Sequence, residues 1–588
     1  MKRLAQVVLL LAGTLALTAV AGASRGDPLV TVGSPSSPFS QNKQNEPAIA
    51  VNPNPVNLTG AMAAGANDNI DEEACNAGDD TTCPFTAGVG GSGIYFSFNG
   101  GSSWTQPTYT GWSARGCLGV VGNADPPCSP VAGGPIGTLP NYFENGLVSD
   151  GDPEVAFGPR PGADGSFSWS NGTRLYYANL TSNFAAARSE QTIKGFEAIA
   201  VSRTDDIEGA AGGDNSAWMN PVIASKQNAA LFSDHPTIAV DDASETSPFF
   251  GSVYVCNAAF RSQEKGGGFA EPIVLNSSHD GGATWRSVQL SPSASNRQVT
   301  GRQDCQVDTD SKGNVYVVWD GVDNKTKQLS LFIAKSSNGG KSFPGPQRVI
   351  TPVTPTGIVD PNTGDLTFDG FAGARDGTAP AFSIANGAPT GVGATDELVV
   401  AWEQGPTPSD TSPGPNEKAD VVRSTDGGST WSGPVSASPS ADRPDFVAIG
   451  ISPNGQHVDV VYDNFLQPWQ STTSTPRLFQ GVVRTAAVGA GGSIGSFSDL
   501  DREATGDARA SSANAQDSEF LGDYNQIVST NTFAAAVWND ARRAADCPAE
   551  DAYRQALTTS TPLPRPAPEQ DCPATFGNTD IFGGVFPR

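Results

Sequence analysis

The sequence predicts an all-β protein, a single β-propeller of about seven four-stranded blades. The chain of 588 residues contains 67 glycines, 45 prolines and 28 phenylalanines, a composition rich in turns and in residues that favour strands. One short motif also recurs along nearly the whole chain. A repeat architecture can spread one fold over a length that would ordinarily imply several domains.

The repeated motif begins with a proline or polar pair and continues as a short apolar strand. A second apolar strand follows each opening, for example Val315–Trp319. Strands this apolar are buried on both faces, as the inner strands of a propeller blade are. The seven openings lie at Glu46, Asp152, Asp234, Asp304, near Pro380, at Pro444 and at Asp523.

The two ends of the chain are expected to meet in one blade. The last copy of the motif ends with Asp580–Val585, which predicts a third strand at the C-terminus. The early strand Leu29–Val32 could therefore complete this blade and close the ring. Closure of this kind removes exposed sheet edges.

Residues 1–23 predict a signal peptide, so that the mature propeller domain spans 24–588 and is secreted to the extracellular space. Lys2 and Arg3 precede an apolar run from Val7 to Val20, and the small residues up to Ala23 form a cleavage pattern. The apolar run is shorter than the roughly 20 residues that a spanning helix needs.

Eight cysteines in an exported chain predict disulfide bonds. Their proximity in the sequence suggests four local pairs: Cys75 with Cys83, Cys117 with Cys128, Cys256 with Cys305, and Cys547 with Cys572. A zinc-type metal site is not expected, because no Cys-x-x-Cys occurs and the three histidines are scattered.

The charge of the chain excludes two classes of partner. The formal net charge is −26, from 61 acidic and 35 basic residues. Nucleic acid and anionic membranes require basic surfaces, so we expect neither as a partner. We expect a monomer whose partner is an extracellular glycan or glycoprotein.

Four tight turns share the pattern Ser-x-Asp/Asn-x-Gly-x-Ser/Thr-Trp/Phe, each between a third and a fourth strand. The Asp or Asn caps backbone donors of the turn, and glycine takes the positive φ. We therefore assign these residues a structural role and no catalytic one. The capping residues are Asn99, Asp280, Asn338 and Asp426.

With these four turns the chain resembles the Asp-box, or BNR-repeat, propellers, a superfamily that includes sialidases and other glycan-active enzymes. The resemblance covers nearly the whole mature chain. It implies a glycoside hydrolase acting on extracellular glycans. Because sialidases have six blades, six is the alternative to the seven openings counted here.

Loops that enter the first strand and loops that leave the second strand lie at the same end of a propeller, around the axis. In this sequence they carry a carboxylate in nearly every blade, interrupted by arginines. The entering loops supply Glu46, Asp152, Asp234, His235, Asp304, Asp442 and Asp523, and the leaving loops supply Asp68, Asn257, Asp320, Glu403, Asp463 and Asp540.

A glycosidase site needs two carboxylates, or a tyrosine with a basic partner in the sialidase variant. Tyr524 or Tyr462 is the candidate nucleophile, and Glu403 its base. Asp152 or Asp234 is the candidate general acid. The substrate carboxylate that sialidases clamp with three arginines would here meet Arg302, Arg375, Arg443 and Arg542.

Several alternatives remain open at this point. Each carboxylate could cap its own loop, and the same oxygens could bind Ca²⁺, although no cofactor is required. The sialidase family has Arg-Ile-Pro in its opening blade, whereas this chain has Asn45-Glu46-Pro47. The rival function is a non-catalytic propeller that binds glycan, protein or calcium. The stretches 74–140 and 406–418 are expected to be long loop insertions.

Overall fold

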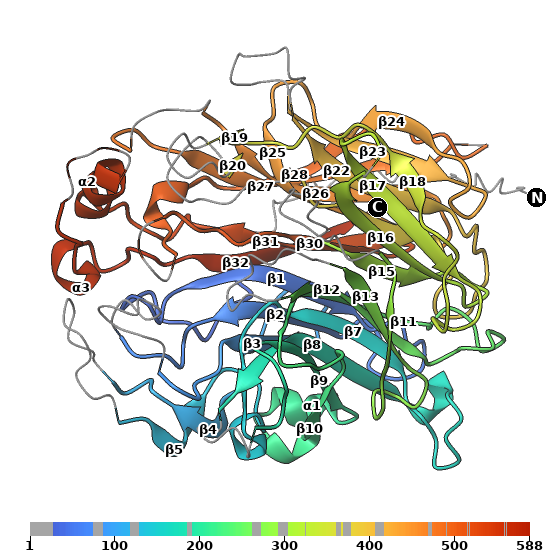
Figure 1. Ribbon diagram of the computed structural model, residues 1–588, viewed down its shortest axis with the longest axis horizontal. Helices are drawn as coiled ribbons and strands as arrows, with labels where there is room; N and C mark the ends of the chain where they lie inside the picture. The colour runs from blue at the N-terminus through green and yellow to red at the C-terminus, as the bar shows by residue number, and fades with distance from the viewer. Residues whose placement is uncertain are drawn as a thin grey trace, which may run out of the picture.

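The structure is a computed structural model in which seven antiparallel sheets surround an axis as the blades of a propeller (Figure 1). The predicted seven blades are therefore confirmed, and the six-bladed alternative is wrong. The described residues are 27–74, 86–117, 129–184, 191–261, 272–291, 304–323, 325–359, 366–367, 378–405, 417–467, 473–489, 491–513, 516, 518–557, 559, 561 and 563–588.

The first four blades follow the chain in order, with the strand nearest the axis first. Blade 1 consists of β1 (Gln44–Val51), β2 (Met62–Asp68) and β3 (Ser92–Ser97). Blade 2 consists of β7 (Glu154–Pro159), β8 (Thr173–Asn183), β9 (Ala198–Thr204) and β10 (Trp218–Ile223), with β6 (Leu147–Ser149) also paired to β8. Blade 3 consists of β11 (Leu231–Val240), β12 (Val253–Arg261), β13 (Ile273–Ser278) and β14 (Arg286–Gln289). Blade 4 consists of β15 (Gln306–Thr309), β16 (Val315–Val322), β17 (Leu329–Ser336) and β18 (Gln347–Ile350).

The last three blades continue the same pattern. Blade 5 consists of β21 (Ala381–Ile384), β22 (Leu398–Gln404), β23 (Lys418–Ser424) and β24 (Ser432–Ser436). Blade 6 consists of β25 (Pro444–Ile451), β26 (His457–Phe465), β27 (Leu478–Ala487) and β28 (Ser498–Arg502), with β29 (Gly506–Asp507) also paired to β27. Blade 7 consists of β30 (Gln526–Ser529), β31 (Phe533–Asp540) and β32 (Asp580–Pro587).

Short elements lie outside the blades. The helices are α1 (Ile207–Ala211), α2 (Pro548–Leu557) and α3 (Pro568–Asp571). Two small hairpins pair β4 (Tyr109–Ser113) with β5 (Val131–Ile136) and β19 (Ile358–Val359) with β20 (Leu366–Thr367). Across the described ranges, no helix has the length and apolar character needed to cross a membrane. The predicted signal peptide lies outside these ranges.

The seven inner strands form a closed ring. Each of β1, β7, β11, β15, β21 and β25 lies against the inner strand of the next blade, and β30 of blade 7 lies against β1 of blade 1. Figure 1 shows this seam as the red strands of blade 7 beside the blue strands of blade 1. The buried residues of neighbouring blades pack together, as in the cluster that joins Ile49 and Met62 of blade 1 to Val537 of blade 7.

The N-terminal end of the chain pairs with the outer strand of blade 7, as the predicted closure requires, but through a single bridge rather than a full fourth strand. Leu29 forms an antiparallel bridge with Phe582 of β32. The amide of Val30 donates a 2.9 Å hydrogen bond to the carbonyl of Ile581. The side chain of Val30 is fully buried in the interface between blades 1 and 7. The closing segment is thus held by both backbone pairing and apolar packing.

The four Ser-x-Asp/Asn turns share one set of hydrogen bonds. In blade 3, Ser278 Oγ accepts the amide of Gly282 at 2.8 Å and donates to Asp280 Oδ1 at 2.8 Å. Asp280 also accepts the amide of Thr284 at 2.9 Å. In blades 1, 4 and 5 the equivalent glycine amide donates to the serine Oγ at 3.0, 3.1 and 2.9 Å, respectively. These contacts satisfy backbone donors that the tight turn leaves unpaired.

Two predicted disulfides are present, Cys256–Cys305 and Cys547–Cys572. The other two proposed pairs involve residues outside the described ranges. The stretch 74–140, expected to be a long loop, contains β3 and the β4–β5 hairpin. Its alternating apolar residues Ile94 and Phe96 are buried in blade 1, which is why this part of the stretch forms a strand. Most of the stretch 406–418 lies outside the described ranges.

Removing buried volume from the closing segment should weaken the ring. We expect Val30→Ala to lower the free energy of unfolding by ~1–3 kcal/mol, because it removes buried methyl groups and leaves a cavity. The matched control is Val32→Ala, since the Val32 side chain is 42% exposed and should contribute little. Urea denaturation of both variants measures the difference. Equal stability of the two variants would contradict the role of Val30 in closure.

The turns can be tested in the same way. We expect Ser278→Ala to lower the free energy of unfolding by ~1–2 kcal/mol, because the buried amide of Gly282 loses its acceptor. The control is Ser429→Ala in the turn of blade 5, where an exposed hydroxyl donates to the Asp426 carbonyl. Denaturation curves that shift equally for both variants would show that the Ser278 hydroxyl does not stabilise the turn.

Candidate functional site

A cavity of about 520 Å³ lies on the propeller axis. Residues of all seven inner strands line it, together with loop residues at the start of several of these strands. Its volume falls within the range of small-ligand sites. The candidate site is the end of this cavity at which the inner strands begin.

The inner strands begin with an unusual backbone conformation that repeats around the axis. In five blades, a residue other than glycine has a positive φ of 47–55° at this point, namely Glu46, Asp152, His235, Asp304 and Phe446. The strand register also shifts here in blades 1, 3 and 6, as a β-bulge does. Left-handed residues cost of order 1–3 kcal/mol each and persist only where the surrounding structure holds them. Strain of this kind concentrates at functional sites.

These openings bring ionisable side chains of four blades together, and a tyrosine of blade 7 joins them. We call this group the axial cluster. It consists of Glu46, Asp152, Asp234, His235, Asp304 and Tyr524.

Asp152 is the centre of the axial cluster. Its carboxyl hydrogen-bonds the carboxyls of both Glu46 and Asp234. Burial, followed by the charges of Glu46 and Asp234, holds the pKa of Asp152 well above its usual value. Two carboxyls can hydrogen-bond each other only when one carries a proton. The raised pKa favours the protonated form of Asp152, which stays partly exposed to solvent.

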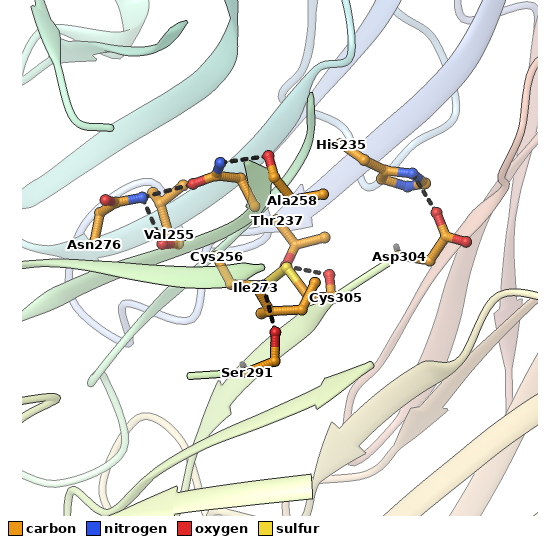
Figure 2. The surroundings of a disulfide bond; sticks show 11 residues. His235, Thr237, Val255, Cys256, Ala258, Ile273, Asn276, Ser291, Asp304 and Cys305 are labelled. Atoms are coloured by element: carbon orange, nitrogen blue, oxygen red, sulfur yellow. Dashed lines mark hydrogen bonds and ion pairs between the residues drawn. A yellow bond between two sulfur atoms is a disulfide. The ribbon is translucent and has the colours of Figure 1, made fainter. Parts of the chain in front are cut away.

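His235 and Asp304 form an ion pair beside the Cys256–Cys305 disulfide (Figure 2). His235 Nδ1 lies 2.6 Å from Asp304 Oδ1. Cys305 follows Asp304 directly, so the disulfide to β12 fixes Asp304 against blade 3. Burial alone would lower the pKa of His235, but Asp304 and other nearby carboxylates outweigh it and raise the pKa to about 10. The imidazole is therefore a cation at neutral pH.

Tyr524 reaches the axial cluster from the loop before β30. Its ring centroid lies 5.0 Å from that of His235. Its hydroxyl is buried, with no hydrogen-bond partner among the described residues. Burial, then the charges of Glu46 and Asp152, raise the pKa of Tyr524 well above 10. The hydroxyl is therefore neutral, and the nearby charges of Glu46 and Asp152 oppose its ionisation.

Two asparagines of the second strands hold Glu46 and Asp152 in place. Asn67 donates a 2.7 Å hydrogen bond to Glu46 Oε2 and accepts the amide of Asp152 at 2.8 Å. Asn539 of blade 7 accepts the amide of Glu46 at 2.9 Å and donates to the carbonyl of Tyr524 at 3.0 Å. Each asparagine thus links two adjacent blades at the level of the cluster.

Glu154 was not among the predicted site residues, although it lines the same cavity. Gln526 of blade 7 donates a 2.9 Å hydrogen bond to it. Burial raises the pKa of Glu154 to about 8, against the opposing effects of Gln526 and His235. Glu154 lies two positions after Asp152, so both side chains fall on one face of the opening strand. That spacing was the signal in the sequence that could have identified it.

Glu403 also lines the axial cavity, but its carboxylate binds backbone donors. It accepts the amide of Val447 and, at 3.3 Å, the amide of Ala379. Glu403 thereby fastens the openings of blades 5 and 6. The other candidate tyrosine, Tyr462, is fully buried and donates a 2.5 Å hydrogen bond to Asp442.

Of the four arginines predicted to bind a substrate carboxylate, the structure describes Arg443 and Arg542. Arg302 and Arg375 lie outside the described residues. Arg443 pairs with Glu417 at 3.1 Å, and Arg542 pairs with Asp540 at 2.6 Å and with Asp27 at 2.8 Å. Among the described residues that line the axial cavity, neither arginine occurs. The turn residues Asn99, Asp280, Asn338 and Asp426 lie at the third-to-fourth strand connections, where they bond their own turns.

No protein-family model matches the chain, and no curated protein matches it. Several solved structures of glycoside hydrolases are similar to it. The Hadza microbial sialidase Hz136 is 14% identical, with 65% of this chain and 62% of that chain covered and a TM-score of 0.32. The GH93 α-L-arabinofuranosidase of Fusarium graminearum is 12% identical, with 82% and 98% covered and a TM-score of 0.35. The leech intramolecular trans-sialidase is 12% identical, with 72% and 65% covered and a TM-score of 0.37.

The pKa shifts predict that acid stabilises the fold. Burial raises the pKa of Glu154 to about 8 and the pKa values of Asp241 and Asp308 to about 7. The folded protein then binds more protons than the unfolded chain between pH 4 and 8, so its stability falls as pH rises through this range. The raised pKa of His235 acts in the same direction, because its contribution is complete below pH 6.5 and is lost as pH rises toward 10.

We therefore expect a higher melting temperature at pH 5 than at pH 8, at constant ionic strength. Glu154→Gln should make this dependence weaker, because it removes one of the groups that take up a proton. Differential scanning calorimetry between pH 5 and 8 measures both effects. A melting temperature that rises toward pH 8 would contradict the raised pKa values.

Proposed function

We propose that this chain is a secreted glycoside hydrolase of the Asp-box propeller type, which cleaves extracellular glycans at the axial cluster. The observation that carries the proposal is the group of Glu46, Asp152 and Asp234, which lies beside Tyr524 and His235 of the axial cavity lining. Glycosidases need one carboxyl that keeps its proton at neutral pH and a second group that acts on the sugar. Carboxyls with raised pKa values beside a cavity meet the first need.

Asp152 is the proposed general acid. It holds a proton shared with its neighbours and remains partly exposed. It donates this proton to the glycosidic oxygen as the bond to the anomeric carbon breaks. Asn67 accepts the backbone amide of Asp152 and so fixes the loop that carries this carboxyl. In the second step the same carboxylate accepts a proton from the attacking water.

Tyr524 is the proposed nucleophile, and Glu46 is a better base for it than Glu403. The charge of Glu46 is the nearest influence on the Tyr524 hydroxyl after burial, whereas both oxygens of Glu403 accept backbone amides. Because the pKa of Tyr524 is far above neutral, the hydroxyl can attack only while a carboxylate removes its proton. The imidazole of His235 lies at a tilt to the tyrosine ring, with the two centroids 5.0 Å apart, and holds a positive charge there.

Specificity for an acidic sugar would require arginines near the cavity. Arg443 and Arg542 are engaged in ion pairs away from the cavity lining. A sialidase-type specificity therefore depends on Arg302 and Arg375. If Arg302→Ala and Arg375→Ala lose activity only on sialylated or uronic acid substrates, those residues bind the substrate carboxylate. Equal activity on neutral and acidic glycosides would remove the sialidase part of the proposal.

The catalytic roles predict a specific pattern of activity loss. We expect Asp152→Asn and Glu46→Gln each to lower kcat by ~10²–10⁴, because each removes a proton donor or acceptor at the reacting bond. Tyr524→Phe should lose activity to a similar extent. Asp426→Asn, on an outer turn, serves as the control and should retain wild-type turnover. The measurement is release of labelled sugar from a panel of glycosides between pH 4 and 8.

The same panel separates the hydrolase from the rival function. A wild-type protein that retains glycans on a binding array and releases no sugar at any pH would be a non-catalytic propeller. In that case the axial variants should weaken binding rather than turnover. A protein that neither binds nor cleaves glycans would overturn the proposal altogether.

A further inference from the structure

A second group of carboxyls lies outside the axial cavity, at the place where the closing segment meets blade 6. Asp27 precedes the closing segment, Asp501 lies in β28, and Glu503 follows that strand. One carboxylate oxygen from each residue lies within 4.8 Å of the others. Two oxygens bound to one Ca²⁺ at 2.3–2.6 Å can be separated by up to about 5 Å. The spacing of the three carboxyls therefore fits a shared ion.

Glu503 supplies an independent indication of a ligand. Its side chain is only 4% exposed, and its Oε1 has no hydrogen-bond partner in the described part of the chain. A buried carboxylate oxygen without a partner is costly, and such groups are normally paired or coordinate a metal. Asp27 is also largely buried, with a side chain that is 10% exposed.

The neighbouring positive charge does not balance the group. Arg542 lies 2.8 Å from Asp27 and 4.0 Å from Glu503. The same guanidinium is also engaged by Asp540, whose Oδ2 accepts its Nε at 2.7 Å. The Arg542 guanidinium thus contacts three carboxyls, those of Asp27, Asp540 and Glu503, an excess of negative charge that a divalent cation would neutralise.

We propose that Asp27, Asp501 and Glu503 bind one Ca²⁺ ion that fastens the closing segment of the ring to blade 6. A set of oxygen ligands selects Ca²⁺ or Mg²⁺ over zinc and copper. Ca²⁺ suits this site better, because it accepts irregular geometry and mono- or bidentate carboxylates, whereas Mg²⁺ demands a near-ideal octahedron and keeps several waters. Asp27 stands two residues before Leu29, which bridges β32. The ion would therefore join residues 27 and 503 directly where the ring closes.

The test uses the full-length mature protein after treatment with EDTA. We expect CaCl₂ to raise its melting temperature in a saturable manner, since an ion that binds only the folded state stabilises it by mass action. Glu503→Gln and Asp501→Asn should each abolish the shift. The control is Asp499→Asn, on the same strand, whose carboxylate pairs with Arg484 and Arg502. This variant should keep the Ca²⁺-dependent shift.

Hydrogen exchange provides a second readout. We expect Ca²⁺ to slow the exchange of the Val30 amide in the wild-type protein and not in Asp501→Asn. If Glu503→Gln does not fold, Asp501→Asn decides the question alone. The proposal is overturned if Ca²⁺ produces no shift in wild-type protein, or if the shift persists in Asp501→Asn. A third result would also overturn it: Glu503→Gln is more stable than the wild type, and the wild-type melting temperature depends on pH but not on Ca²⁺. Asp27 and Glu503 would then share a proton instead of an ion.

Discussion

Closure of the ring between blades 7 and 1 is the constraint on which the candidate site depends. The inner strand of blade 7 lies against that of blade 1, and the segment before Val32 pairs with the outer strand of blade 7 at the same seam. The axial cluster is built across this seam. Tyr524 and Gln526 come from blade 7, Glu46 from blade 1, and Asp152 and Glu154 from blade 2. An open ring would separate the tyrosine from its carboxyls.

The second element of the account is a backbone conformation repeated in several blades. A left-handed residue stands at the start of the inner strand in five blades, and Glu46, Asp152, His235 and Asp304 occupy four of these positions. The strain is offset by specific hydrogen bonds, such as those of Asn67 to Glu46 and Asp152. Because this backbone conformation recurs at the start of several inner strands, the propeller brings side chains from distant parts of the chain close together.

Much of this architecture could be predicted from the sequence, because a repeat is a local pattern. The seven openings predicted seven blades, and the apolar segment Leu29–Val32 predicted the closing strand. The members of the axial cluster were among the residues expected around the axis, because they stand at the openings of the repeats, whereas Glu154 of the cavity lining was not. The part played by each member could not be predicted. Sequence position does not show that Glu403 is occupied by the amides of neighbouring strands, whereas Asp152 faces two other carboxyls.

Contacts between segments that are distant along the chain could not be predicted from the sequence either. Asp27 and Glu503 approach each other only through ring closure, and no spacing rule connects them. The stretch 74–140 was expected to be a long loop, yet it contains β3 of blade 1, the third strand that the turn at Asn99 predicted. Local patterns predict strands and turns well, whereas packing between blades decides which polar groups meet.

The central claim is that the axial carboxyls share protons at neutral pH, and infrared difference spectroscopy tests it most directly. The spectrum of the wild-type protein at pH 7, minus that of Asp152→Asn, isolates the carboxyl stretch of the cluster. The account predicts that Asp152→Asn and Glu46→Gln each remove intensity from the band of protonated carboxylic acids, while Asp426→Asn leaves it unchanged. If both axial variants instead remove intensity only from the ionised carboxylate band, Asp152 and Glu46 are fully charged at pH 7 and the account of the site is wrong.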